Sequence, residues 1–177
     1  MNTRIATAFL AAIAATGAAM ITPAAALDGS ASGALAHSSN KGPFSALTGS
    51  WSGSGSILLS GGDSESIRCR ANYTSGQSGY TLQQGLRCAS DSYNFNLSSQ
   101  IRSEGGNIDG TWQEKTRNVS GEISGRATGE MIQASVESTG FTASLSLATR
   151  GDRQTVTIRS EGTDLAGASI TLRRGPR

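Results

Sequence analysis

From about Leu47 to Arg174 the chain alternates apolar and polar residues almost without interruption. The segments 93–97 (YNFNL) and 141–147 (FTASLSL) show the pattern plainly. A period of two residues means that successive side chains leave opposite faces of a strand, so one face is apolar and the other polar. The pattern predicts an all-β fold, in which about ten antiparallel strands form a single up-and-down β-barrel or a strongly curled sheet around the apolar face.

Short turns rich in glycine, serine and aspartate separate the expected strands, for example at 61–63, 105–106, 151–152 and 162–164. The alternation predicts strands over residues 51–60, 65–73, 80–88, 93–101, 107–115, 119–128, 131–138, 141–149, 153–160 and 167–174. Helical periodicity of useful length is absent beyond the first 26 residues.

Alternation also sorts the side chains between the two faces. We expect the interior to hold Ile67, Ala71, Tyr73, Leu82, Leu86, Tyr93, Phe95, Leu97, Ile101, Ile108, Trp112, Val119, Ile123, Ile132, Val136, Phe141, Leu145, Leu147, Val156, Ile158, Ile170 and Leu172. The outer face is expected to hold Arg68, Arg70, Asn94, Asn96, Gln113, Glu122, Arg126, Thr155, Thr157 and Arg159. Small residues such as Gly53, Gly55 and Ala143 share the inward parity, which suits either a tightly coiled sheet or an unfilled pocket.

An outer-membrane barrel also alternates over strands of about ten residues, but with its apolar side chains outside and polar groups inside. This sequence shows no aromatic girdles and finishes on Arg-Gly-Pro-Arg rather than on an aromatic residue. We therefore expect the apolar face to point inward, without stable insertion into a membrane.

The first residues are typical of an export signal. Arg4 precedes an uncharged, alanine-rich stretch, and small residues follow Pro23, which predicts a signal peptide over 1–26 with cleavage after Ala26. The stretch is too short and too poor in leucine for a transmembrane anchor. Residues 27–46 are rich in serine, glycine and alanine and are expected to be a flexible linker, followed by the barrel domain over 47–177. Because of this signal we expect the mature protein to be periplasmic or secreted.

Charge gives no sign of a nucleic-acid partner. The formal net charge is +2, and removal of Arg4 would leave 14 basic against 13 acidic residues. A near-neutral chain is not drawn to nucleic acid or to an anionic membrane by its net charge.

Cys69 and Cys88 are expected to form a disulfide, because an exported protein meets an oxidising compartment. Both flank a hairpin whose midpoint, between Ser78 and Gly79, is also the midpoint of the two cysteines. A two-residue turn would place them at a hydrogen-bonded site, where the Cα atoms are further apart. A four-residue loop over 77–80 would place them at the closer kind of site. We expect that loop and a bridge that contributes about 3 kcal/mol; the alternative is two buried free thiols.

Gly49-Ser50-Trp51 opens the first expected strand and resembles the Gly-x-Trp start of lipocalins and related calycin barrels. The resemblance implies that Trp51 closes one end of a barrel and that a basic residue of the last strand packs over it. Arg174 is the matching residue, and such a contact contributes about 0.5–2 kcal/mol. The second lipocalin signature, a Thr-Asp-x turn midway along the chain, is absent from its usual place, since Thr163-Asp164-Leu165 comes too late. The resemblance covers only the ends of the domain.

A second partial resemblance is to small bacterial periplasmic inhibitors of metalloproteases, which are lipocalin-like barrels with a Gly-x-Trp start and one disulfide between neighbouring strands. Cys69 and Cys88 follow Trp51 in a comparable order. Those proteins are shorter and act through an N-terminal segment that has no match here.

Catalysis finds little support in the sequence. The one histidine, His37, lies in the expected linker, and the carboxylates lie mostly in turns or on the polar face. Spacing typical of metal ligands is absent, as is a glycine-rich loop that leads into a helix. We expect a protein without enzymatic activity, metal or cofactor.

The main functional hypothesis is a small apolar or amphipathic ligand bound inside the barrel. The expected ligand-binding residues are Trp51, Leu82, Leu86, Phe95, Leu97, Trp112, Ile123, Phe141 and Leu145. The alternative is an envelope structural protein, interaction module or protease inhibitor with a filled core. In that case a protein partner would contact the loops, the tail or the outward arginines Arg68, Arg70 and Arg87, two of which should face each other.

Overall fold

The computed structural model describes residues 41–176. The predicted signal peptide, the linker up to residue 40 and His37 lie outside the described residues. The strands are β1 (Gly49–Leu59), β2 (Ser64–Gly76), β3 (Thr81–Ala89), β4 (Asn94–Glu104), β5 (Asn107–Glu114), β6 (Val119–Thr128), β7 (Met131–Ser138), β8 (Phe141–Arg150), β9 (Arg153–Glu161) and β10 (Leu165–Arg174). The predicted strand limits differ from these by three residues at most.

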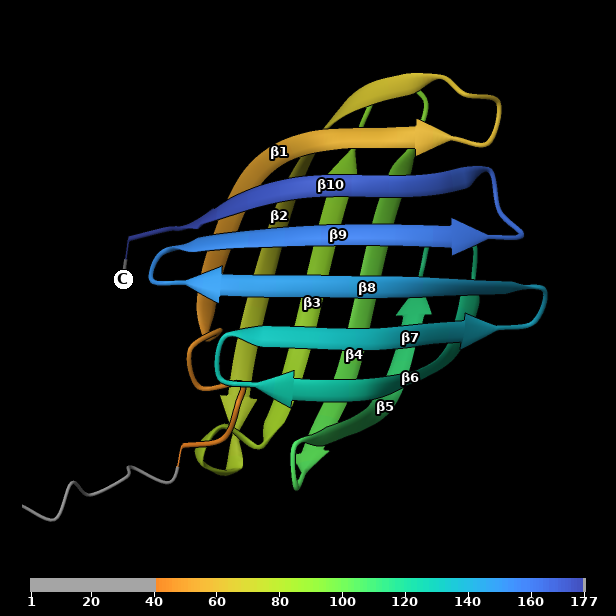
Figure 1. Ribbon diagram of the computed structural model, residues 1–177. Coiled ribbons are helices and arrows are strands. Elements are labelled where there is room, and N and C mark those ends of the chain that lie inside the picture. Colours follow the sequence, from red (N-terminus) through yellow and green to blue (C-terminus); the bar gives the residue numbers. More distant parts are fainter. Residues whose placement is uncertain (1–40, 177) are drawn as a thin grey trace, which may run out of the picture. The chain divides into compact units, whose positions relative to one another are not determined.

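The strands of this domain form one closed antiparallel barrel (Figure 1). Each strand pairs with its neighbours in the chain, and β1 pairs with β10 to complete the circle, with Trp51 opposite Arg174. The prediction of an all-β, up-and-down barrel is confirmed. A closed sheet satisfies the backbone of every strand and leaves no edge open to a further chain.

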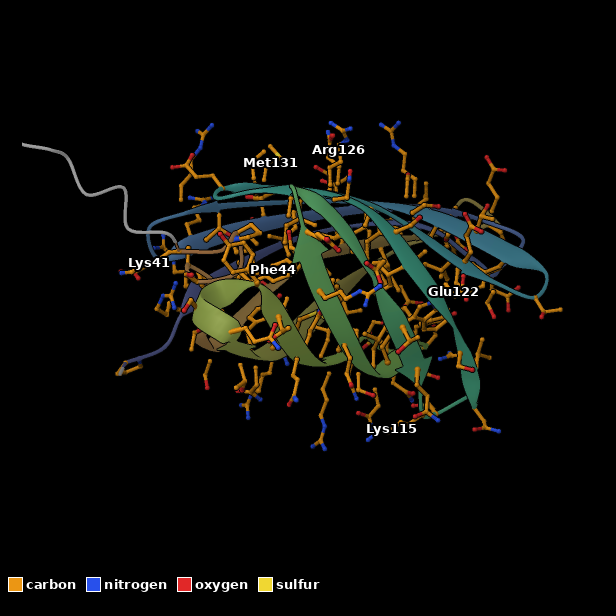
Figure 2. The ribbon with its side chains drawn as sticks, turned by 90° about the horizontal axis from the view of Figure 1, so that it is seen from below. Lys41, Phe44, Lys115, Glu122, Arg126 and Met131 are labelled. Carbon is orange, nitrogen blue, oxygen red and sulfur yellow. A yellow bond between two sulfur atoms is a disulfide. The ribbon has the colours of Figure 1, made fainter. Side chains whose placement is uncertain are left out.

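The apolar face points inward, as predicted. Phe95, Leu145 and Ile158 pack against the core, whereas Asn94 and Thr157 are exposed on the outside. Arg126 of β6 and Met131 of β7 project outward (Figure 2). This arrangement is the reverse of the one found in outer-membrane barrels. Residues 41–176 also contain no helix of the length and apolarity that a membrane span requires.

The small inward residues of β1 mark a place where the sheet coils tightly. A Cβ atom added at Gly53 would lie 2.0 Å from the carbonyl oxygen of Thr171, and one at Gly55 would lie 1.9 Å from that of Ser169. Glycine is therefore required for β1 to bend across β10, and the ribbon shows β1 curving strongly here (Figure 1). At these two positions the glycines permit the coil and do not line the cavity inside the barrel.

The cysteine hairpin agrees with the prediction. Gly76 pairs with Thr81, so residues 77–80 form a four-residue loop, which contains a short 3₁₀ turn. Cys69 lies opposite Cys88, the two form a disulfide, and their Cα atoms are 4.1 Å apart. This separation is that of the closer, non-hydrogen-bonded pair.

The domain begins earlier than the sequence suggested. Residues 42–46 were expected to be flexible linker, but Phe44 is fully buried and Leu47 is 2% exposed. The backbone N–H of Gly42 donates to Ser78 O at 2.8 Å, and that of Phe44 donates to Gly79 O at 3.0 Å. Phe44 lies inside the end of the barrel beside the 77–80 loop (Figure 2). The prediction for 42–46 is wrong because one aromatic side chain, buried at the barrel end, anchors this segment.

Candidate ligand-binding cavity

A cavity of about 410 Å³ lies inside the barrel. It is located toward the end where β3, β5, β7 and β9 finish, since residues of the turns that follow β5 and β9 line it. We call this the open end. The apolar wall comes from strands all round the barrel and comprises Ile57, Ile67, Leu86, Cys88, Tyr93, Phe95, Leu97, Trp112, Val119, Val136, Phe141, Ala143, Leu145, Ile158, Leu165, Ala168 and Ile170.

Most of the predicted ligand-binding residues meet at this cavity. Its lining includes Leu86, Phe95, Leu97, Trp112, Phe141 and Leu145. Trp51, Leu82 and Ile123 do not line it, although each is buried. Trp51 packs in the opposite, closed end, and Leu82, at the second position of β3, lies toward that end as well. Alternation gives the face of a residue but not its height along the barrel, which explains why the prediction did not separate these three residues from the cavity wall.

The closed end is filled around Trp51. The indole N–H of Trp51 donates to Leu47 O at 2.7 Å, and the Arg174 guanidinium lies 4.3 Å from the centre of the indole ring. Arg174 donates to the carbonyl oxygens of Thr48 and Ala46 and forms an ion pair with Asp152 at 3.2 Å. The resemblance to calycin barrels implied this stacking of Arg174 on Trp51. Arg174 thus ties the segment before β1 to the last strand.

A small polar cluster is buried at the closed end. The Tyr73 hydroxyl donates to Gln154 Oε1 at 2.9 Å, and the Gln154 amide donates to the Thr149 hydroxyl at 3.3 Å. Burial raises the pKa of Tyr73, and the bond to Gln154 opposes this only in part. These groups satisfy one another, so they fix the packing of the closed end and are not free to bind a ligand.

Aromatic side chains surround the open end. Tyr93 and Phe95 lie on the same strand face with ring centres 4.7 Å apart, and Trp112 meets Phe141 edge to face at 5.5 Å. Such rings present large apolar surfaces with few rotatable bonds, which suits the wall of a binding site.

The cavity lining also contains three charged residues, Glu114, Arg117 and Asp164, which the sequence analysis did not predict there. Glu114 is buried at the end of β5, and its carboxylate accepts the backbone N–H groups of Asn96, Thr116 and Arg117 at 2.8, 3.1 and 2.7 Å. Burial alone would raise the pKa of Glu114, but these N–H bonds together hold it below its ordinary value. The available signal was parity, since Glu114 continues the inward series of Ile108 and Trp112.

Arg117, in the turn after β5, reaches back across the aromatic pair. Its guanidinium carbon lies 4.2 Å from the centre of the Tyr93 ring and 5.8 Å from that of Phe95. Its Nη1 donates to Asn94 O at 2.8 Å and lies 3.8 Å from the Glu114 carboxylate. No sequence signal predicted the contact with the two rings, because Arg117 lies in a turn and both rings are more than twenty residues away along the chain.

The outer surface carries a larger but shallower hollow of about 710 Å³ over β1, β8, β9 and β10. Short side chains, chiefly serine and threonine, form most of its floor. It is open to solvent and therefore cannot withdraw apolar ligand surface from water, whereas the interior cavity can. For residues 41–176, no group of three or more His, Cys, Asp or Glu side chains could hold a metal ion.

The outward arginines lie together as expected. Arg70 is directly opposite Arg87, Arg68 follows on the same strand, and all three are exposed around a hollow of about 390 Å³. Among the side chains that the structure describes, no carboxylate forms an ion pair with them. Like charges held opposite each other repel, so this patch would be stabilised by an anion.

Comparison with known proteins supports the fold. No family model matches the chain, and no curated protein matches it either. Rv2717c from M. tuberculosis is structurally similar, with a TM-score of 0.59 and 14% identity over 75% of this chain and 94% of that one. The S-type phycobiliprotein lyase CPES from Guillardia theta gives a TM-score of 0.53 and 13% identity over 76% of this chain and 91% of that one. Both comparisons concern the fold alone, and together with the closed topology they fit a lipocalin-like fold.

Proposed function

We propose that this protein is an exported, non-enzymatic barrel that binds a small apolar or amphipathic molecule in its interior. The cavity of about 410 Å³ carries the proposal, because it lies in the size range of ligand sites and its wall is apolar. Burial of a ligand there would be driven by about 25 cal/mol for each Å² of apolar surface withdrawn from water. A filled interior would have favoured the alternative, a protein that acts only through its surface.

Export is part of the proposal and rests on two features. The alanine-rich N-terminal sequence is typical of a cleaved signal, and the Cys69–Cys88 disulfide is typical of proteins that mature in an oxidising compartment. A periplasmic or secreted carrier of hydrophobic molecules would agree with both.

One of the similar structures is named as a lyase, but the proposed function here includes no catalytic step. The buried carboxylate of Glu114 accepts three backbone N–H groups and so serves the structure of its turn. Chemical conversion of a bound ligand by the purified protein would contradict this part of the proposal.

The test uses purified protein, native mass spectrometry after incubation with a lipid extract, and titration with an apolar fluorescent probe. Ala143→Phe should fill the cavity and weaken probe binding by at least about tenfold, equivalent to about 1.4 kcal/mol. Ala148→Phe is the matched control, since Ala148 lies on the same strand but on the outer face. A protein that retains no hydrophobic adduct and binds no probe would overturn the proposal.

A second candidate function is supported by the outer arginines. The unpaired patch of Arg68, Arg70 and Arg87 fits an anionic surface on a partner, so the barrel would act as an interaction module of the cell envelope. Replacement of all three by glutamate should abolish capture of a protein partner in a pull-down, while Arg126→Glu, elsewhere on the outer face, should not. Equal binding by both variants would remove this candidate.

A further inference from the structure

The mouth of the cavity holds one cation whose position is fixed but whose hydrogen-bonding capacity is mostly unused. Arg117 rests on the Tyr93 and Phe95 rings and is tethered through Nη1 to Asn94 O. A guanidinium has five N–H donors. Within residues 41–176, the Nη1 bond to Asn94 is the one hydrogen bond that this guanidinium donates.

The neighbouring carboxylate does not occupy these donors. Glu114 is 5% exposed, and both its oxygens already accept backbone N–H groups of the 114–117 turn and of Asn96. Its closest approach to the Arg117 guanidinium is 3.8 Å, which is too long for a hydrogen bond. Glu114 therefore orders the turn that presents Arg117, and the guanidinium edge stays available.

The surroundings of Arg117 favour an anion there. Its side chain is 40% exposed, so it lies where the cavity meets solvent, and it is preorganised by two aromatic rings that also form the wall. A preorganised guanidinium binds carboxylate or phosphate with two parallel N–H bonds and loses little side-chain entropy in doing so.

We infer that the ligand is amphipathic, with a terminal carboxylate or phosphate that Arg117 binds at the mouth and an apolar tail that enters the barrel. This rests on the proposed function and names the ligand class. The tail would lie against Leu97, Leu145, Ile158 and Ile170, all of which line the cavity.

Asp164 is the main competing feature, because it also lines the cavity and would favour a cationic headgroup. Asp164 is exposed. The hydrogen bond that the structure shows for it is made by its backbone carbonyl, which accepts the Ser60 N–H at 2.9 Å. An exposed carboxylate without a fixed position keeps its water, whereas Arg117 is already held in place.

The experiment measures displacement of the bound probe by four ligands with the same twelve-carbon tail: the carboxylic acid, the monoalkyl phosphate, the alcohol and the primary amine. The acid, the phosphate or both should bind about tenfold more tightly than the alcohol, equivalent to about 1.4 kcal/mol. Whichever of the acid and the phosphate binds more tightly then identifies the headgroup. The amine should bind no better than the alcohol.

Three variants assign the effect to its residue. Arg117→Gln should erase the advantage of the acid over the alcohol, and Arg117→Lys should restore part of it, since lysine keeps the charge but not the planar pair of donors. Lys115→Gln is the matched control, because Lys115 is in the same turn but projects into solvent and does not line the cavity (Figure 2). It should retain the full advantage.

The outcomes separate the inference from the proposal on which it rests. Equal affinity for acid, phosphate and alcohol would overturn the role of Arg117 while interior binding stands. If the amine bound most tightly, the role of Arg117 would be wrong and Asp164 would be the residue that binds the headgroup. Failure of all four ligands and of the probe to bind would overturn both the inference and the proposed function.

Discussion

The two ends of the barrel each stack an arginine on an aromatic ring, yet the arginines are held differently. At the closed end Arg174 lies 4.3 Å from the centre of the Trp51 ring and donates to the carbonyl oxygens of Thr48 and Ala46. At the open end Arg117 lies 4.2 Å from the centre of the Tyr93 ring, with Asn94 O as its one hydrogen-bond acceptor among the described residues. The same contact thus completes a packed structure at one end and leaves a cation for a ligand at the other.

The two ends differ because the segment before β1 enters the barrel at the closed end only. Phe44 and Leu47 fill the closed end. The same segment supplies the backbone carbonyl of Leu47 to Trp51 and those of Ala46 and Thr48 to Arg174. The open end has only short turns, which are too small to cover the Phe95 and Phe141 rings. A cavity therefore remains where no segment of the domain enters the barrel.

Truncation of one aromatic side chain at each end tests the contrast between the two ends. Trp51→Ala should lower the free energy of unfolding by about 4 kcal/mol, because it empties a filled site. Tyr93→Ala should cost only about 1 kcal/mol, since Tyr93 is half-buried at a cavity that is already hollow. Urea denaturation followed by far-UV circular dichroism measures both. Similar losses would mean that the two ends are equally packed.

The disulfide provides the next largest effect and lies in the wall rather than at either end. Replacement of both Cys69 and Cys88 by serine should lower stability by about 3 kcal/mol, because the bridge closes a loop of nineteen residues in the unfolded chain. In the protein without the disulfide, Trp51→Ala should still lower the free energy of unfolding by more than Tyr93→Ala does. If oxidised and reduced protein unfold at the same urea concentration, the bridge does not stabilise the barrel.

Glu114 tests how the open end is built. Glu114→Ala should cost about 2 kcal/mol, since it leaves three partly buried N–H groups without their acceptor. Hydrogen exchange should accelerate most at the amides of Thr116 and Arg117. Glu122→Ala is the control, because this exposed glutamate projects from the outer face (Figure 2) and its loss should cost under about 0.5 kcal/mol. Equal effects would show that Glu114 does not organise the turn.

The smallest expected effect is on the pH dependence of stability. The pKa of Glu114 is lowered in the folded protein, so its contribution is fully present above its ordinary value of 4.5. That contribution is lost as the pH falls below 4.5 and through the folded value. Unfolding free energy measured from pH 6 down to pH 3 should therefore decline less for Glu114→Gln than for the native chain. Parallel curves would contradict this assignment.

The strands and their faces were predictable because alternation is a local property. Ile158 and Thr157 take opposite faces whatever the rest of the chain does, and the spacing of Cys69 and Cys88 about a hairpin fixes their pairing. Phe44 could not be predicted as core, since it precedes the alternation in a segment rich in small residues. Arg117 could not be predicted as part of the site, since a turn residue has no assigned face.

The pattern of residues alone predicts an antiparallel sheet curled around an apolar face and the pairing of Cys69 with Cys88. The folded domain adds that the sheet closes on itself and that its interior is filled at one end and hollow at the other. The physical reason is that alternation specifies which side of the sheet a residue occupies, whereas packing depends on the coil of the sheet at glycines such as Gly53 and on which segments enter the barrel.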